Sequence, residues 1–109
     1  MTRRTVKIKR DDGGRRRFRV LFQAGAFVVH RSWSRAAWCL PFTVTHAHSG
    51  LSCSRDYTIR AAKAVARALD AMPINWRSVR NARDLTAEQT KTANETIRAA
   101  KTAPKEAPK

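Results

Sequence analysis

The chain has 109 residues, enough for one small domain with a modest core. Its 23 lysines and arginines outnumber its 8 aspartates and glutamates, giving a formal net charge of +15. Self-repulsion of this size opposes compaction and favours a polyanionic partner, nucleic acid first and an anionic membrane surface second. A soluble basic protein with no anionic partner is the alternative. No apolar run approaches the roughly 18–20 residues of a membrane span, so a membrane role would be peripheral.

The positive charge is concentrated at the N-terminal end of the chain. Residues 1–35 hold eleven Arg or Lys against two Asp. Arginine is preferred there, and its guanidinium can bind two phosphate oxygens at once. No apolar segment follows the basic N-terminus as in a signal peptide, and there are only two cysteines. These features predict a cytoplasmic setting, the host cell's cytoplasm if a phage encodes the chain.

The first predicted element is a basic hairpin. Thr5–Arg10 alternates apolar and basic residues, which is the period of a half-buried strand. Asp11–Gly14 (DDGG) is a strong turn signal, and RRRFRVLFQAG resumes the alternation as far as Gly25. The two runs therefore predict a hairpin whose outer face carries Lys and Arg.

Further strands are predicted between Ala26 and Ser54. AFVVHRSW is one candidate, and AWCLPFTVTH follows the polar RSWSR segment. In AWCLPFTVTH, alternation puts Val44 and His46 on an apolar face and Thr43 and Thr45 on the other. Pro41 cannot donate to a ladder, so this strand is expected at a sheet edge or bulged. A turn with left-handed Gly50 then leads into the returning strand LSCS.

The segment CLPFTVTHAHSGLSC places His46 and His48 between the only two cysteines, Cys39 and Cys53. Zinc needs three or four converging N or S ligands, and structural sites supply close pairs such as C-x2-C. Alternation puts Cys39 on the face opposite His46, so only His46 and Cys53 could easily meet. The pattern favours a hairpin in which His46 closes the core, with no metal site and no cofactor.

From Asp56 the apolar period becomes helical. Ile59, Ala62, Leu69 and Met72 recur at three- and four-residue steps with Val65 or Ala66, and Pro73 stops the pattern. Asp56 or Thr58 can cap this amphipathic helix. Trp76 is expected to cover the core.

A weaker helix is predicted over Leu85–Lys101, with a capping box from Thr86 to Gln89. It either docks loosely or extends as an appendage. The fold class is α+β: a small antiparallel sheet of three to five strands packed against one amphipathic helix, plus this C-terminal helix. We expect a basic sheet-and-helix domain over residues 1–80, the C-terminal helix over 81–101 and a disordered tail over 102–109.

The stretch Phe27–Met72 contains strands, then SGL, a returning strand and a helix opening on TIRAAKAVARAL. It resembles the three-stranded-sheet-plus-helix DNA-binding modules of the AP2-like and phage-integrase N-terminal type. In those modules the sheet lies in the major groove and the helix packs behind it. The resemblance covers under half of the chain and rests on element order, so no functional residue is carried over. The chain is also similar in style to the small basic proteins of phages and mobile elements.

Catalytic motifs are missing from the sequence. There is no Gly-rich phosphate loop, H-E-x-x-H or G-x-S-x-G, and no carboxylates cluster by spacing. We therefore expect a non-enzymatic nucleic-acid-binding protein, with DNA preferred to RNA as the partner and phosphate contacts supplying the affinity. The alternative is an anti-CRISPR-like protein–protein inhibitor of a host nucleic-acid enzyme, whose partner is a host protein.

The candidate binding residues come from the hairpin, the RSWSR segment and one face of the first helix. Trp33 could stack on a base or fold back onto the core. Arg60, Lys63 and Arg67 form a ridge along the first helix, and this ridge could simply be the solvated face of the helix. It becomes a candidate binding surface if it is continuous with the basic side of the sheet. The full set is Lys7, Lys9, Arg15, Arg16, Arg17, Arg19, Arg31, Trp33, Arg35, Arg60, Lys63 and Arg67.

Overall fold

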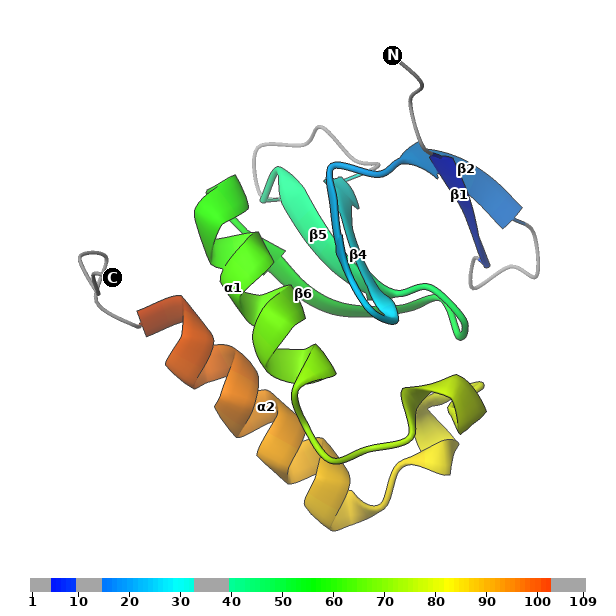
Figure 1. Ribbon diagram of the computed structural model, residues 1–109, viewed down its shortest axis with the longest axis vertical. Helices are drawn as coiled ribbons and strands as arrows, with labels where there is room; N and C mark the ends of the chain where they lie inside the picture. Colours follow the sequence, from blue (N-terminus) through cyan, green and yellow to red (C-terminus); the bar gives the residue numbers. More distant parts are fainter. Residues whose placement is uncertain (1–4, 10–14, 33–39, 103–109) are drawn as a thin grey trace.

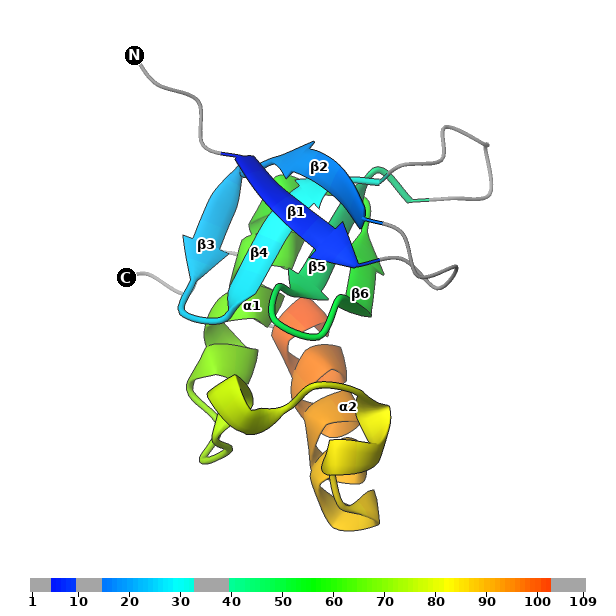
Figure 2. The ribbon, with the colours of Figure 1, turned by 90° about the vertical axis from the view of Figure 1, so that its right-hand side faces the viewer.

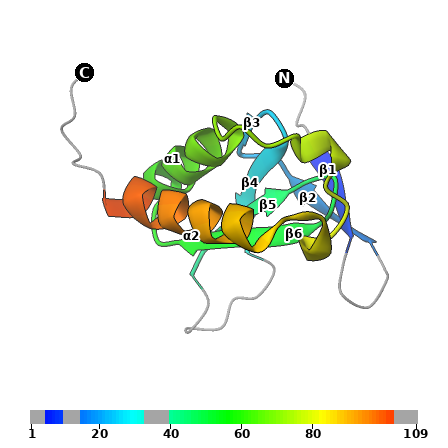
Figure 3. The ribbon, with the colours of Figure 1, turned by 90° about the horizontal axis from the view of Figure 1, so that it is seen from below.

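A computed structural model of the chain describes residues 5–9, 15–32 and 40–102, which form three layers (Figure 1). A four-stranded antiparallel sheet lies in the middle, with two helices on one face and a two-stranded sheet on the other (Figure 3). The α+β class and the antiparallel pairing agree with the sequence prediction. The strands form two sheets, however, and not the single sheet predicted.

The two-stranded sheet is the predicted N-terminal hairpin. β1 (Thr5–Lys9) pairs with β2 (Arg15–Arg19) in antiparallel register, with Lys7 opposite Arg17. Ile8 is 5% exposed, and Val6 and Phe18 are partly buried. Figure 2 shows this hairpin crossing in front of the larger sheet. Its apolar residues therefore cover the face of that sheet opposite the helices.

The larger sheet is a meander in the order β3-β4-β5-β6. Ala24 pairs with Phe27 across a two-residue turn whose first residue, Gly25, has φ +55°. This is a conformation that glycine adopts without strain. Gly50 has φ +80°, as the sequence predicts for the next turn. The strands are β3 (Phe22–Ala24), β4 (Phe27–Arg31), β5 (Phe42–His46) and β6 (Leu51–Asp56).

The prediction that Pro41 marks an edge strand or a bulge is wrong. β5 lies in the interior of the sheet, between β4 and β6. Pro41 precedes the first residue of the strand, so the ladder does not need its missing N–H, and its carbonyl accepts a bond from Ser32 N at 2.8 Å. The bulge falls between Val44 and Thr45, where the register leaves Cys53 of β6 as the extra residue.

The main core lies between the larger sheet and α1 (Ile59–Asp70). The helix buries Ala62, Val65, Ala66 and Leu69, which belong to the apolar stripe in the sequence. Thr58 is the N-cap, because its hydroxyl accepts a bond from Ala61 N at 3.1 Å. The helix ends at Asp70, shortly before Pro73.

Trp76 covers one end of this core, as predicted. It opens the short helix η1 (Trp76–Ser78), which is followed by η2 (Ala82–Asp84). Its indole N–H donates to the carbonyl of Leu69 at 2.8 Å, and its ring meets Phe27 edge-on with centroids 4.7 Å apart. An aromatic ring is thus buried with its one polar group satisfied.

The second helix, α2 (Ala87–Thr102), begins with the predicted capping box. Thr86 Oγ1 accepts from Gln89 N at 3.0 Å, and Gln89 Oε1 accepts from Thr86 N at 2.9 Å. The helix packs along α1 and buries Ala93. Near its end, Lys101 Nζ lies 3.3 Å from the buried carboxylate of Asp56. α2 is therefore docked along α1 and does not extend as an appendage; residues 103–109 of the expected tail lie outside the described residues.

The layer between the hairpin and the sheet is partly polar. Thr43 and Thr45 are 3% and 2% exposed, although alternation assigned them to the face away from the core. The hairpin covers them together with His30, whose ring stacks on Phe18 with centroids 4.1 Å apart. Within the described residues, every buried side-chain polar atom has a hydrogen-bond partner. The hairpin thus adds a second, partly polar core to the fold.

Candidate nucleic-acid interface

Acidic side chains are absent from residues 13–55, which include β2 to β5 and most of β6. Between Asp12 and Asp56 there is no Asp or Glu, whereas this stretch contains seven arginines. Asp56 itself is buried against Lys101. The other acidic residues within the described ranges are Asp70, Asp84, Glu88 and Glu95, at the end of α1 and beyond it. Basic side chains on the strands therefore have few neighbouring carboxylates to neutralise them.

The outer face of the hairpin presents Lys7, Arg17 and Arg19, which we call the hairpin cations. All three are exposed, and Lys7 is the Cα partner of Arg17. Like charges directly opposite each other on a sheet are destabilising, by roughly 0.2–1 kcal/mol in magnitude. The fold tolerates this repulsion on a face that an anion can reach.

Three further predicted residues lie on the hairpin strands. Lys9 is the Cα partner of Arg15, and Arg16 is the Cα partner of the buried Ile8. The side chains of Lys9, Arg15 and Arg16 lie outside the described part of the structure. Their backbone positions place them on the same hairpin as the hairpin cations.

A second set of cations surrounds one end of the larger sheet. The register aligns Arg31 with Phe42 and Phe42 with Asp56, and Phe22 opens β3 at the same end. The Arg31 guanidinium lies 5.5 Å from the centre of the Phe42 ring. From α1, Lys63 and Arg67 lie 5.4 and 4.9 Å from the centre of the Phe22 ring. Each of these aromatic rings therefore carries a cation on its face.

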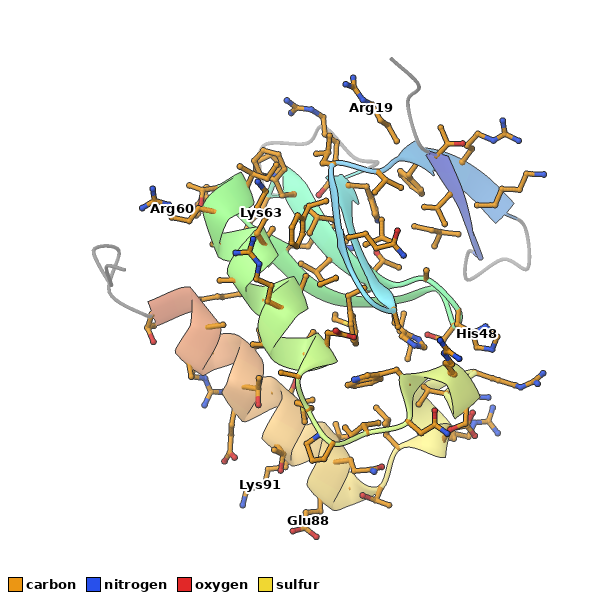
Figure 4. All side chains as sticks on the ribbon, in the orientation of Figure 1. Arg19, His48, Arg60, Lys63, Glu88 and Lys91 are labelled. Carbon is orange, nitrogen blue, oxygen red and sulfur yellow. The ribbon has the colours of Figure 1, made fainter. Side chains whose placement is uncertain are left out.

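We call this set the basic rim: Arg19, Arg31, Arg60, Lys63 and Arg67, with Phe22 and Phe42. Figure 4 shows Arg19, Arg60 and Lys63 at one end of the molecule, and Glu88 and Lys91 at the other. Arg60 lies in the first turn of α1, where no acidic residue offsets it. A positive charge there opposes the helix dipole, so an anion near Arg60 would be favourable.

The rim and the hairpin cations share Arg19. Arg19 ends β2, and Phe22, which contacts the two cations of α1, begins β3. The short connection between them carries the chain from the hairpin layer to the sheet layer. Phe22 thus links Lys63 and Arg67 of α1 to the segment that leaves the hairpin at Arg19. Continuity of the ridge of Arg60, Lys63 and Arg67 with the basic side of the hairpin stays a prediction.

Tyr57 is the residue that the sequence interpretation missed. It is 78% exposed, and it is the one large hydrophobic side chain that is exposed among the described residues. It directly precedes the N-cap Thr58, where an apolar residue often packs against the fourth helical residue. That residue, Ala62, is fully buried without it. From the sequence, an aromatic residue before a helix cap is expected to pack against the helix, so the exposure of Tyr57 was not predicted.

Trp33 and Arg35 belong to the segment 33–39, which lies outside the described residues. The segment begins and ends at the basic rim, because Ser32 follows Arg31 and Leu40 precedes Phe42 by two residues. Ser32 Oγ donates to the carbonyl of Leu40 at 2.5 Å and lies 2.7 Å from Thr43 Oγ1. The two ends of the segment are thus joined at the rim.

His46 and Cys53, which the sequence suggests could meet across the central hairpin, do so through the backbone of His46, which hydrogen-bonds the Cys53 thiol. The ring of His46 makes its contacts elsewhere. His46 Nε2 donates to the carbonyl of Trp76 at 2.9 Å, and its Nδ1 lies 2.7 Å from Ser49 Oγ. Cys53 Sγ donates to the carbonyl of Leu51 at 3.6 Å. Within residues 5–9, 15–32 and 40–102, no three His, Cys, Asp or Glu side chains are grouped to hold a metal ion.

Cys53 is expected to be an unreactive thiol. Burial raises its pKa to about 11, so about one molecule in a thousand carries the thiolate at pH 8. In a Cys39→Ser variant, Cys53 should react with a disulfide reagent about 100-fold more slowly than free cysteine, and urea should abolish the difference. A folded protein that reacts as fast as free cysteine would contradict this environment for Cys53.

Comparisons of the chain with protein-family models, curated sequences and solved structures give no significant match. None of the helices in the described ranges is long and apolar enough to cross a membrane. The functional assignment therefore rests on the residues of this chain.

Proposed function

We propose that the protein binds nucleic acid without catalysing a reaction, chiefly through contacts between its cations and phosphates. The observation that carries the proposal is the grouping of the hairpin cations and the basic rim, which share Arg19, in a chain whose residues 13–55 contain no Asp or Glu. A polyanion at this surface would release its counterions and relieve the repulsion between Lys7 and Arg17.

The aromatic contacts support this proposal because they restrict the cations. Arg31 lies over Phe42, and Arg67 lies over Phe22. When the flat face of a guanidinium lies on an aromatic ring, the N–H groups at the edge of the guanidinium stay free to donate hydrogen bonds to phosphate oxygens. Less side-chain entropy is then lost on binding than for a freely moving arginine. Such contacts provide affinity and orientation and carry no sequence information.

The direct test is fluorescence anisotropy with labelled oligonucleotides of about 20 nucleotides at about 50 mM salt. Two unrelated DNA sequences should bind with similar affinity, and the same two sequences as RNA should match each other in affinity. An Arg15→Ala, Arg16→Ala, Arg17→Ala variant should bind all of them more weakly. If no nucleic acid binds under these conditions, the proposal is wrong. Recovery of one stoichiometric protein from a host lysate, together with that result, would replace it with the inhibitor function.

A further inference from the structure

We infer that the basic rim is a site for single-stranded nucleic acid, with Tyr57 as the platform on which an unpaired base stacks. This rests on the proposed function and names its substrate class. The first argument is that the fold makes no use of the Tyr57 ring, which is 78% exposed. Aromatic side chains usually bury much of their area, so a ring held in solvent at a charged surface is a candidate for ligand contact.

The second argument is that the neighbours of Tyr57 are fixed on both sides. Asp56 is buried, accepts a bond from Ser54 Oγ at 3.1 Å and pairs with Lys101 at 3.3 Å. Thr58 caps α1 through Ala61 N. The backbone of Tyr57 is therefore held between the end of β6 and the start of α1. A ring on an anchored backbone loses little freedom when a base stacks on it.

The third argument is the position of Tyr57 among the cations. The row formed by Arg31, Phe42 and Asp56 runs across the end of the sheet, and Tyr57 is the next residue beyond it. Arg60 follows three residues later, in the first turn of α1. A strand of nucleic acid could thus place a base on Tyr57 and its flanking phosphates against arginines. Aromatic platforms beside a basic track are the recurring means of binding single strands.

The preference for single strands follows from the chemistry of stacking. Inside a duplex, both faces of every base are covered by neighbouring bases, so a protein ring cannot stack on them. Phosphates, in contrast, are accessible in both forms. The hairpin cations should therefore serve duplex and single strand alike, whereas Tyr57 should contribute only when bases are unpaired.

The experiment compares wild type with Tyr57→Ala and Tyr57→Phe. The probes are labelled single strands of about 12 thymidines or uridines, a DNA duplex of similar length and inorganic polyphosphate. A non-nucleotide linker closes each end of the duplex, so that the duplex has no unpaired base. Tyr57→Ala should weaken binding to both single strands about 10-fold, while Tyr57→Phe should bind them nearly as well as wild type. Binding to duplex and to polyphosphate should stay within about twofold in both variants, because neither offers an unpaired base.

The outcomes separate this inference from the proposed function. If Tyr57→Ala binds single strands as tightly as wild type, or weakens single strand and duplex equally, the stacking platform is disproved. The phosphate-binding function would then stand, provided that wild type binds both probes. If wild type binds none of the probes, both ideas fail. Because Tyr57 is exposed, circular dichroism should show all three proteins equally folded.

Discussion

Replacing Lys7, Arg17 and Arg19 with threonine is expected to weaken nucleic-acid binding roughly 100-fold at about 50 mM salt. Each of these hairpin cations is exposed on β1 or β2, where threonine suits the strand. The loss should be similar for unrelated sequences, since phosphate contacts are sequence-independent. The variant should be at least as stable to urea as wild type, because the Lys7–Arg17 repulsion is removed.

A matched control separates local contacts from net charge. Arg77→Ala, Arg80→Ala, Lys91→Ala removes the same number of positive charges from exposed positions in and after η1 and on α2. Figure 4 places Lys91 at the end of the molecule away from the basic rim. This control should keep its affinity within about threefold of wild type, since charges beyond a Debye length are largely screened. Equal losses in the two variants would mean that net charge, and not the hairpin surface, drives binding.

The second large effect is a loss of stability at mildly acidic pH. His30 and His46 are 3% and 1% exposed, and burial lowers the pKa of both imidazoles below the ordinary value of 6.5. Each ring is held in its neutral form: a carbonyl accepts from one nitrogen, and a hydroxyl bonds the other. For His30 these partners are the carbonyl of Arg31 at 2.9 Å and Thr45 Oγ1 at 2.8 Å. A proton added to either ring would leave a buried charge.

The direction of the pH effect follows from proton binding in the two states. Below pH 6.5 the unfolded chain protonates both histidines while the folded protein does not, so the unfolded state takes up more protons. Stability is therefore complete above pH 6.5 and is lost as the pH falls below it. The free energy of unfolding should fall by up to about 2.7 kcal/mol per pH unit until the folded pKa values are reached.

Urea denaturation between pH 7.5 and about pH 5 measures this effect. His30→Gln should be less stable at every pH but should lose about half of the slope, because one of the two buried titrating groups is gone. A stability that stays constant from pH 7.5 to about pH 5 would contradict the burial of these histidines in their neutral form.

Local structure could be predicted from the sequence where a periodic pattern of apolar residues ends at a turn or capping signal. The N-terminal hairpin follows from alternation on both sides of DDGG, and its register pairs Lys7 with Arg17. The apolar residues of α1 and the capping box of α2 are also where the pattern put them. In each case the determinants lie within a few residues of one another, so neighbouring side chains suffice to define the structure.

The layering could not be predicted, because it depends on contacts between distant segments. The apolar alternation of Phe18, Val20 and Phe22 continues across the boundary, yet the chain leaves the hairpin after Arg19 and enters the larger sheet at Phe22. Thr43 and Thr45 look like solvent-facing residues in the sequence, and only the hairpin above them makes that face a second core. The cations of the basic rim are all among the predicted binding residues, but their grouping at one end of the sheet could not be predicted for the same reason: they come from the end of β2, from β4 and from α1.

The measurement that tests the central claim most directly is the salt dependence of the affinity of wild-type protein for nucleic acid. If phosphates bind the hairpin cations and the basic rim, log K should fall linearly with log salt concentration. A slope of about −2 to −5 would correspond to three to seven neutralised phosphates on a single strand. A slope near zero, with binding that persists at high salt, would contradict phosphate binding as the basis of the interaction.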